Sequence, residues 1–174
     1  MWVCGGRGKG FSRASVIQRD FILRLIEEFF MFLAKALGTF QKKDIPRAEA
    51  SIDLAYRRFL GLSAEFAERT SIDSLLALFR VDPDRSASQC LIAAELMRAR
   101  GMIRREQGTD EQAERLFLRA VAFYLESLPL PSQAETLAYQ PGLREAYEGC
   151  KNRLGPDEIA RITALLDPPG QERS

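Results

Sequence analysis

The chain has 174 residues, 46% of them hydrophobic, and its 25 lysines and arginines nearly balance its 24 aspartates and glutamates, which leaves a formal net charge of +1. This length predicts one globular domain. The charge balance argues against a dedicated nucleic-acid-binding protein, which usually carries a strong basic excess. The sequence contains no histidine, which excludes catalytic triads of the Ser-His-Asp and Cys-His kinds and removes the commonest metal ligand.

The three cysteines, Cys4, Cys90 and Cys150, are spread along the chain. They lack the paired spacing of a zinc site, and their odd number predicts reduced thiols in a cytoplasmic protein. The most apolar stretch, residues 21–37, contains four charged side chains and is short for a bilayer, so we expect no membrane span. We likewise expect no metal and no cofactor.

Residues 1–15 are rich in glycine and carry basic side chains, which predicts a disordered leader. The glycines around Lys9 are similar to those of a phosphate-binding loop, but that loop needs Ser or Thr after its lysine, where this chain has Gly10. We therefore expect a single helical domain over residues 16–167, followed by a flexible tail at 168–174.

A long helix is expected over residues 16–37, ending at Gly38. At about 100° per residue, its apolar side chains cover roughly twice the arc of an ordinary surface helix. We therefore expect this helix to be covered on two sides, either by the rest of the chain or by a partner chain.

Further helices follow, most of them marked by a start or stop signal. Three open with capping boxes, Ser86-x-x-Gln89, Thr109-x-x-Gln112 and Ser132-x-x-Glu135, and Pro141 is expected to open a helix of its own. The expected ranges are 45–60, 63–68, 71–80, 86–107, 109–128, a short helix from 132, 141–154 and 156–167. No stretch shows the alternating pattern of a strand, so the fold class is all-α, with about seven to eight helices in antiparallel hairpins.

Two pairs of these helices share one spacing of small and bulky residues. The small residues let paired helices approach closely, and the bulky ones fill the gaps between them. The first pair has Phe32, Ala36, Ala48, Ile52 and Ala55, and the second has Met97, Gly101, Ala113, Phe117 and Ala120 at the same offsets. The pattern resembles the tetratricopeptide helix–turn–helix unit over residues 29–62 and 94–127, which implies helical hairpins with a groove.

Some positions depart from that family. Lys35 and Arg100 stand where the tetratricopeptide pattern has leucine, and the two copies are not separated by a multiple of the family's repeat length. We therefore expect a tetratricopeptide-like fold rather than a regular array. Residues 19–27 also resemble the first helix of a small family of uncharacterised bacterial helical proteins, and the Phe-Tyr pair at 123–124 with Leu128 is similar to a later landmark of it. This second resemblance implies a helical fold and a bacterial origin.

The tetratricopeptide resemblance places four side chains of each unit on the groove. In the first unit these are the apolar residues Phe30, Leu33, Leu37 and Phe40, and in the second they are Glu95, Arg98, Met102 and Arg105. Two arginines a two-turn step apart could hold a carboxylate in fork geometry, and the alternative is a solvated basic face. An apolar patch such as the first set marks an interaction site or is covered, either by the chain itself or by a second copy.

These observations favour a non-enzymatic helical protein–protein interaction module. Its expected partner-binding residues are Arg98, Met102 and Arg105 together with Phe30, Leu33, Leu37 and Phe40. The expected partner is a protein of unknown identity or a second copy, rather than nucleic acid. The alternative is a helical nucleic-acid-binding regulator that would use Arg98, Arg100, Arg104 and Arg105, although these are scattered around their helix. An enzyme of unrecognised type comes third.

Overall fold

The computed structural model describes residues 13–128 and 133–167, and their backbone forms eight α-helices without any strand. The all-α fold class and the expected seven to eight helices are therefore confirmed. The helices are α1 (Arg13–Gln41), α2 (Ile45–Ala55), α3 (Ala64–Arg69), α4 (Ile72–Phe79), α5 (Pro83–Glu106), α6 (Asp110–Glu126), α7 (Gln133–Cys150) and α8 (Pro156–Leu166). A π-helical turn, η1 (Tyr56–Leu60), continues α2, and a 3-10 turn, η2 (Lys151–Arg153), follows α7.

Helix α1 is longer than expected at both ends. It begins at Arg13 and so includes three residues that we assigned to the leader, while residues 1–12 and the expected tail at 168–174 lie outside the described residues. At its other end α1 continues through Gly38, which does not adopt the left-handed conformation that ends a helix. Lys43 takes that conformation instead, with φ of 64°.

The starts of α5 and α7 also differ from the predictions. Helix α5 begins at Pro83, whose fixed φ suits a first turn, so the expected start at Ser86 is wrong. Pro141 lies inside α7 instead of opening a new helix. Tyr139 and Leu143 are fully buried on either side of it, and this packing keeps the helix continuous across the missing hydrogen bond.

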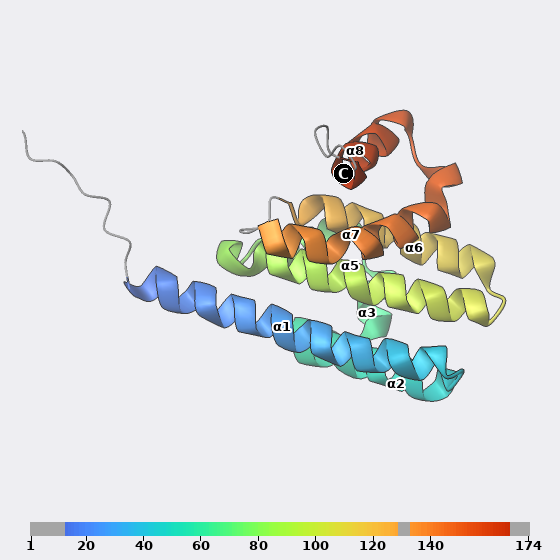
Figure 1. Cartoon of the computed structure of the whole chain (residues 1–174), viewed down its shortest axis with the longest axis horizontal. Helices are drawn as coiled ribbons and strands as arrows, with labels where there is room; N and C mark the ends of the chain where they lie inside the picture. Colours follow the sequence, from blue (N-terminus) through green and yellow to red (C-terminus); the bar gives the residue numbers. More distant parts are fainter. Residues whose placement is uncertain (1–12, 129–132, 168–174) are drawn as a thin grey trace, which may run out of the picture.

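Helix α5 is the centre of the molecule, and all of its residues from 91 to 101 are buried. Helices α1 and α2 lie along one side of it, and α6 and α7 lie along the other (Figure 1). A helix that is buried on opposite sides has no single apolar face, so the sequence pattern of α5 does not show which helices pack against it.

Much of the wide apolar arc of α1 is covered by the chain itself, although Phe21 in its first part is 57% exposed. The buried residues Ile26, Phe29 and Leu33 belong to it, and α1 contacts both α2 and α5. The expected covering on two sides is therefore provided by two helices of the same chain. Across the described ranges, no helix combines the length and the apolar character needed to cross a membrane.

Candidate functional site

The four apolar groove positions predicted for the first unit do not form an open groove. Leu33 is only 3% exposed and belongs to the core. Phe30, Leu37 and Phe40 are half-buried and pack against that core. Covering by the chain itself is one of the two alternatives that the sequence left open, and it follows from the position of α1, whose apolar face packs against α2 and α5.

The polar positions predicted for the second unit form a buried cluster instead. Arg98 donates from Nη2 to Glu95 Oε2 at 2.7 Å and from Nε to the same oxygen at 3.1 Å. The hydroxyl of Tyr124 donates to Glu95 Oε1 at 2.7 Å, and Arg98 also pairs with Glu145 on α7. Burial alone would lower the pKa of Arg98, but the Glu95 carboxylate beside it raises that pKa above its ordinary value. The Arg98 charge is therefore compensated within the chain.

Helix α7 covers the rest of this predicted face. Arg98 Nη1 donates to the sulfur of Met102 at 3.2 Å, and the Arg105 guanidinium lies 4.6 Å from the centroid of the Phe117 ring. A Cβ at Gly142 of α7 would lie 2.3 Å from the Tyr124 hydroxyl, so only glycine fits there. The structure thus places Arg98 in the packed seam between α5 and its neighbours and Met102 at the edge of that seam, whereas the Arg105 side chain is exposed and lies over the Phe117 ring.

A second charged cluster joins α2, α3 and α5. Arg100 donates to Glu68 at 2.7 Å, to Asp53 at 2.8 Å and to Glu49 at 3.4 Å. Arg104 pairs with the same Glu49 at 3.1 Å. Arg98 and Arg100, two of the four arginines in the nucleic-acid alternative, are therefore buried against carboxylates rather than presented to phosphates.

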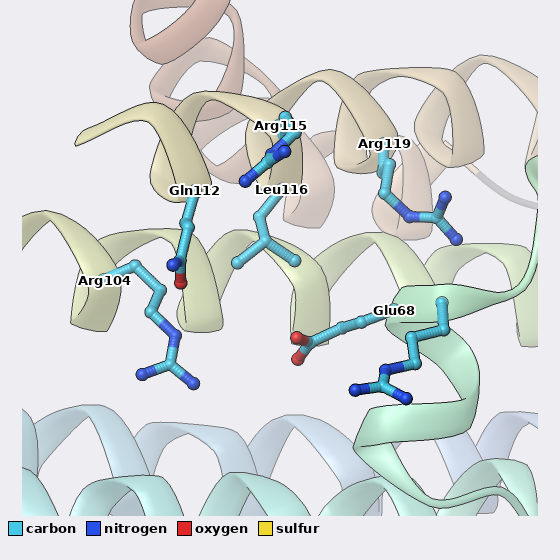
Figure 2. A pocket seen from close by; sticks show the side chains of 7 residues that line it. Glu68, Arg104, Gln112, Arg115, Leu116 and Arg119 are labelled. Carbon is cyan, nitrogen blue, oxygen red and sulfur yellow. The ribbon is translucent and has the colours of Figure 1, made fainter. Parts of the chain in front are cut away.

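A pocket of about 330 Å³ opens beside this second cluster, between α3, α5 and α6 (Figure 2). Charged and polar side chains dominate its lining, with one apolar contact. The lining residues are Glu68, Arg69, Arg104, Gln112, Arg115, Leu116 and Arg119. Four arginines and one glutamate give this lining a formal charge of +3, and we refer to it as the arginine pocket.

Arg119 is the least compensated of the arginines that line the pocket. Its Nη2 donates to the carbonyl oxygens of Ala67 at 2.8 Å and Thr70 at 2.6 Å, at the end of α3. Its Nε is buried without a hydrogen-bond partner, and within the described residues it forms no ion pair with a carboxylate. Burial lowers the pKa of Arg119, whereas carboxylates raise that of Arg100. The pocket wall thus contains a partly desolvated positive charge whose hydrogen bonds go to neutral carbonyls, while the nearby Glu68 carboxylate offsets only part of the effect of burial on its pKa.

The other arginines of the pocket have weak or shared partners. Arg69 and Arg115 are exposed and pair only with exposed carboxylates one turn away, at 3.2 and 3.7 Å. Exposed pairs of this kind contribute about 0.5 kcal/mol or less, so both side chains can turn toward a ligand. The Glu68 carboxylate, which Figure 2 shows between Arg104 and Arg119, is already bound by Arg100.

A second hollow of about 340 Å³ adjoins the arginine pocket and shares Arg69 with it. Ser63, Glu65, Phe66 and Thr70 complete its lining. The Phe66 side chain is 49% exposed, so it offers an apolar surface beside the cationic one. Because the two hollows share Arg69, one extended chain could contact both.

The side chains of the arginine pocket are suited to binding an anion. The described residues contain no group of acidic or cysteine side chains arranged to hold a metal ion. Burial raises the pKa of Cys90 to about 11 and that of Cys150 to about 12, so both thiols are neutral at physiological pH. Guanidinium groups can hold a carboxylate or phosphate in fork geometry.

A comparison with protein-family models, with curated proteins and with solved structures found no match. The site therefore has to be interpreted from its own geometry. Sequence reasoning missed Arg69, Gln112, Arg115 and Arg119, and it considered Arg104 only for nucleic acid. One local signal was present: Arg115 and Arg119 lie one turn apart and would share a face of α6.

Proposed function

We propose that this chain is a non-enzymatic helical protein-interaction module that binds an acidic, extended segment of a protein partner in the arginine pocket. The observation that supports this most strongly is the incompletely compensated charge of Arg119 in a concave wall. An anion placed there would supply the counter-charge that the chain itself does not. Arg69 and Arg115 at the rim can add charge-assisted hydrogen bonds at little cost, because their own pairs are weak.

A polypeptide segment is favoured over a small anion by the second hollow. An extended segment that places an acidic side chain in the arginine pocket could place an apolar side chain against Phe66. A nucleic acid is less suited to this surface, because it needs a row of phosphate contacts along a basic face. The arginines gather around one concave site, and the whole chain has a net charge of only +1.

The resemblance to tetratricopeptide units remains part of this proposal. Paired helices with small residues at the contact are consistent with it, and α5 and α6 contain the second copy of the spacing. In the proposed complex the partner segment would lie across α3 and α6, beside that helical hairpin, rather than on the groove positions predicted from the resemblance.

The proposal is tested with a short fluorescein-labelled peptide that is rich in glutamate and contains one leucine. Fluorescence anisotropy at low salt measures its affinity for the wild type and for Arg115→Gln, an exposed rim residue whose loss should not disturb folding. We expect Arg115→Gln to weaken binding by about tenfold, which corresponds to about 1.4 kcal/mol. The matched control is Arg161→Gln, an exposed arginine on α8, which should bind like the wild type.

Two results would contradict the proposal. In the first, the glutamate-rich peptide binds no better than the same peptide with glutamine in place of glutamate. In the second, Arg115→Gln and Arg161→Gln weaken binding equally, because attraction would then reflect overall charge rather than this pocket.

A further inference from the structure

We infer that the arginine pocket accepts the dianionic phosphoryl group of a phosphorylated serine or threonine within the bound partner segment. This inference rests on the proposed function and adds the chemical group that the pocket selects. It starts from the charge of the lining, formally +3 from four arginines and one glutamate. A carboxylate has one negative charge, whereas a phosphoserine or phosphothreonine has about −1.5 to −2 at neutral pH.

The number and origin of the donors also suit a phosphoryl group. The guanidinium groups come from three helices, with Arg69 on α3, Arg104 on α5, and Arg115 and Arg119 on α6. Figure 2 shows Gln112 on the same wall, where its amide could add a neutral donor. A phosphoryl group presents three strong acceptor oxygens in a tetrahedral array, and so it can meet donors that arrive from several directions. A planar carboxylate can meet fewer of them.

Glu68 opposes part of the positive charge of the lining. Its carboxylate lies in the lining and is held there by Arg100 at 2.7 Å. It repels a dianion about twice as strongly as a monoanion. The four arginines outnumber this one carboxylate, so the lining still attracts a dianion more strongly than a monoanion. The preference for a phosphoryl group therefore comes from the arginines.

The phosphoryl group is assigned to a partner's side chain rather than to a free phosphate. The hollow that contains Phe66 shares Arg69 with the arginine pocket and could contact the residues next to the phosphorylated one. A free phosphate would leave that apolar surface uncovered. The segment should therefore bind more tightly than inorganic phosphate because of its flanking residues.

Five probes are compared by isothermal titration calorimetry on the full chain. Four probes test the chemistry: a phosphoserine peptide with a neighbouring leucine, the same peptide with glutamate at that position, the same peptide with unmodified serine, and inorganic phosphate. A single-stranded oligonucleotide tests the nucleic-acid alternative. We expect the phosphoserine peptide to bind about tenfold more tightly than the glutamate peptide, and each of the other probes to bind more weakly than the phosphoserine peptide.

The pH dependence gives an independent measurement. The second pKa of a phosphoryl group is about 6, so lowering the pH from about 7.5 to 5.5 converts most of the dianion to the monoanion. Binding of the phosphoserine peptide should weaken several-fold over this range, whereas binding of the glutamate peptide should stay nearly constant because its carboxylate remains charged.

Two variants link the preference to the pocket. Arg115→Gln should reduce the preference for phosphoserine over glutamate, and Arg119→Lys should reduce it further, because lysine keeps the charge but loses the fork. Arg161→Gln is the control. Circular dichroism checks that Arg119→Lys is folded, since Arg119 also binds the end of α3. If Arg119→Lys is not folded, the inference is tested by the preference of Arg115→Gln for phosphoserine over glutamate, compared with that of Arg161→Gln.

The outcomes separate this inference from the proposed function. If the glutamate and phosphoserine peptides bind equally through Arg115, the phosphoryl inference is wrong and the proposed function stands. If no peptide binds, the proposed function is wrong. Inorganic phosphate that binds as tightly as the phosphoserine peptide would overturn the assignment to a partner's side chain. Tighter binding of the oligonucleotide than of every peptide would replace a protein partner with a nucleic acid.

Discussion

Three buried or half-buried arginines show how the surroundings of one residue type decide its role. Arg98 and Arg100 each have a carboxylate at 2.7 Å, and the pairs of Arg98 with Glu145 and of Arg100 with Glu68 join α5 to α7 and α3. Arg119 has only carbonyl oxygens as hydrogen-bond acceptors in the described structure. Removing one partner from a buried pair leaves an uncompensated charge, so the first two are structural, whereas the third has capacity to bind an anion.

Two buried tyrosines differ in whether the hydroxyl has a partner, and this difference predicts opposite effects of substitution. Tyr56 is fully buried and its hydroxyl has no hydrogen-bond partner, so Tyr56→Phe should leave the free energy of unfolding unchanged or raise it slightly at neutral pH. Tyr124→Phe removes the donor to Glu95 and should cost about 1–3 kcal/mol. Urea denaturation of both variants measures this, and equal effects would contradict the assignment.

The same tyrosines predict a loss of stability at alkaline pH. Burial raises the pKa of both hydroxyls above the ordinary value of 10.0. Above about pH 10 the unfolded chain therefore loses protons that the folded chain retains, and the free energy of unfolding falls by about 1.4 kcal/mol per pH unit for each tyrosine. Below about pH 10 both hydroxyls stay protonated in the folded and the unfolded chain, so their contribution to the free energy of unfolding is fully present. Thermal melting between pH 8 and about 11 should show that the melting temperature of Tyr56→Phe falls less than that of the wild type. Identical falls in melting temperature would mean that ionisation of Tyr56 does not cause the loss of stability.

At the scale of elements, one aromatic ring determines how α5, α6 and α7 approach one another. A Cβ at Gly101 of α5 would lie 2.9 Å from Cε1 of Phe117, and one at Gly149 of α7 would lie 2.5 Å from Cδ2 of the same ring. The Phe117 ring on α6 is thus held between two glycines, with Arg105 over one face. It has no free side into which it could move.

Alanine at Gly101 should therefore be destabilising, although alanine normally favours a helix. We expect Gly101→Ala to cost about 1–3 kcal/mol through overpacking against Phe117. Gly38→Ala is the matched control, since a Cβ at Gly38 would meet nothing within 4 Å and alanine should stabilise α1 by about 0.5–1 kcal/mol. Chemical denaturation gives both values. A Gly101→Ala variant as stable as the wild type would mean that the helices are less closely packed.

The sequence predicted which segments are helical better than it predicted where they end. Pro46 lies in the first turn of α2, and Gly61 and Gly108 adopt positive φ after α2–η1 and α5, as expected. Local signals failed at Gly38, which α1 passes without ending, and at Pro141, where the buried Tyr139 and Leu143 pack on either side of the proline. A glycine or proline in the sequence permits a helix to begin or end there, and the tertiary contacts decide whether it does.

At the scale of the whole molecule, the candidate site could not be derived from the periodicity of single helices. The sequence identified the polar positions on α5. It did not show that α7 covers Arg98, or that the end of α3 accepts hydrogen bonds from Arg119 on α6. The arginine pocket is lined by the consecutive helices α5 and α6 together with α3, which precedes them in the chain. The position of α3 beside this hairpin is a tertiary contact that no repeat pattern specifies.

The packing of the molecule predicts how Leu33→Asp behaves. Leu33 is 3% exposed beneath α2 and α5, so a buried carboxylate there should unfold the chain or reduce its helicity strongly. Met31→Asp is the control, because Met31 is 66% exposed on the same helix. Circular dichroism and light scattering distinguish the possibilities. A folded Leu33→Asp protein with half the mass of the wild type would show that this face is an interface between two copies.

The central claim is that an anionic segment binds among the arginines of one pocket, and nitrogen-15 NMR of the arginine Nε–Hε groups tests it most directly. Arg119→Lys assigns the Arg119 signal, whose Nε has no partner in the free protein. Addition of the phosphoserine or glutamate-rich peptide should shift the signals of Arg69, Arg104, Arg115 and Arg119 and leave that of Arg161 unchanged. A peptide that saturates the protein without moving the Arg115 and Arg119 signals would contradict the account.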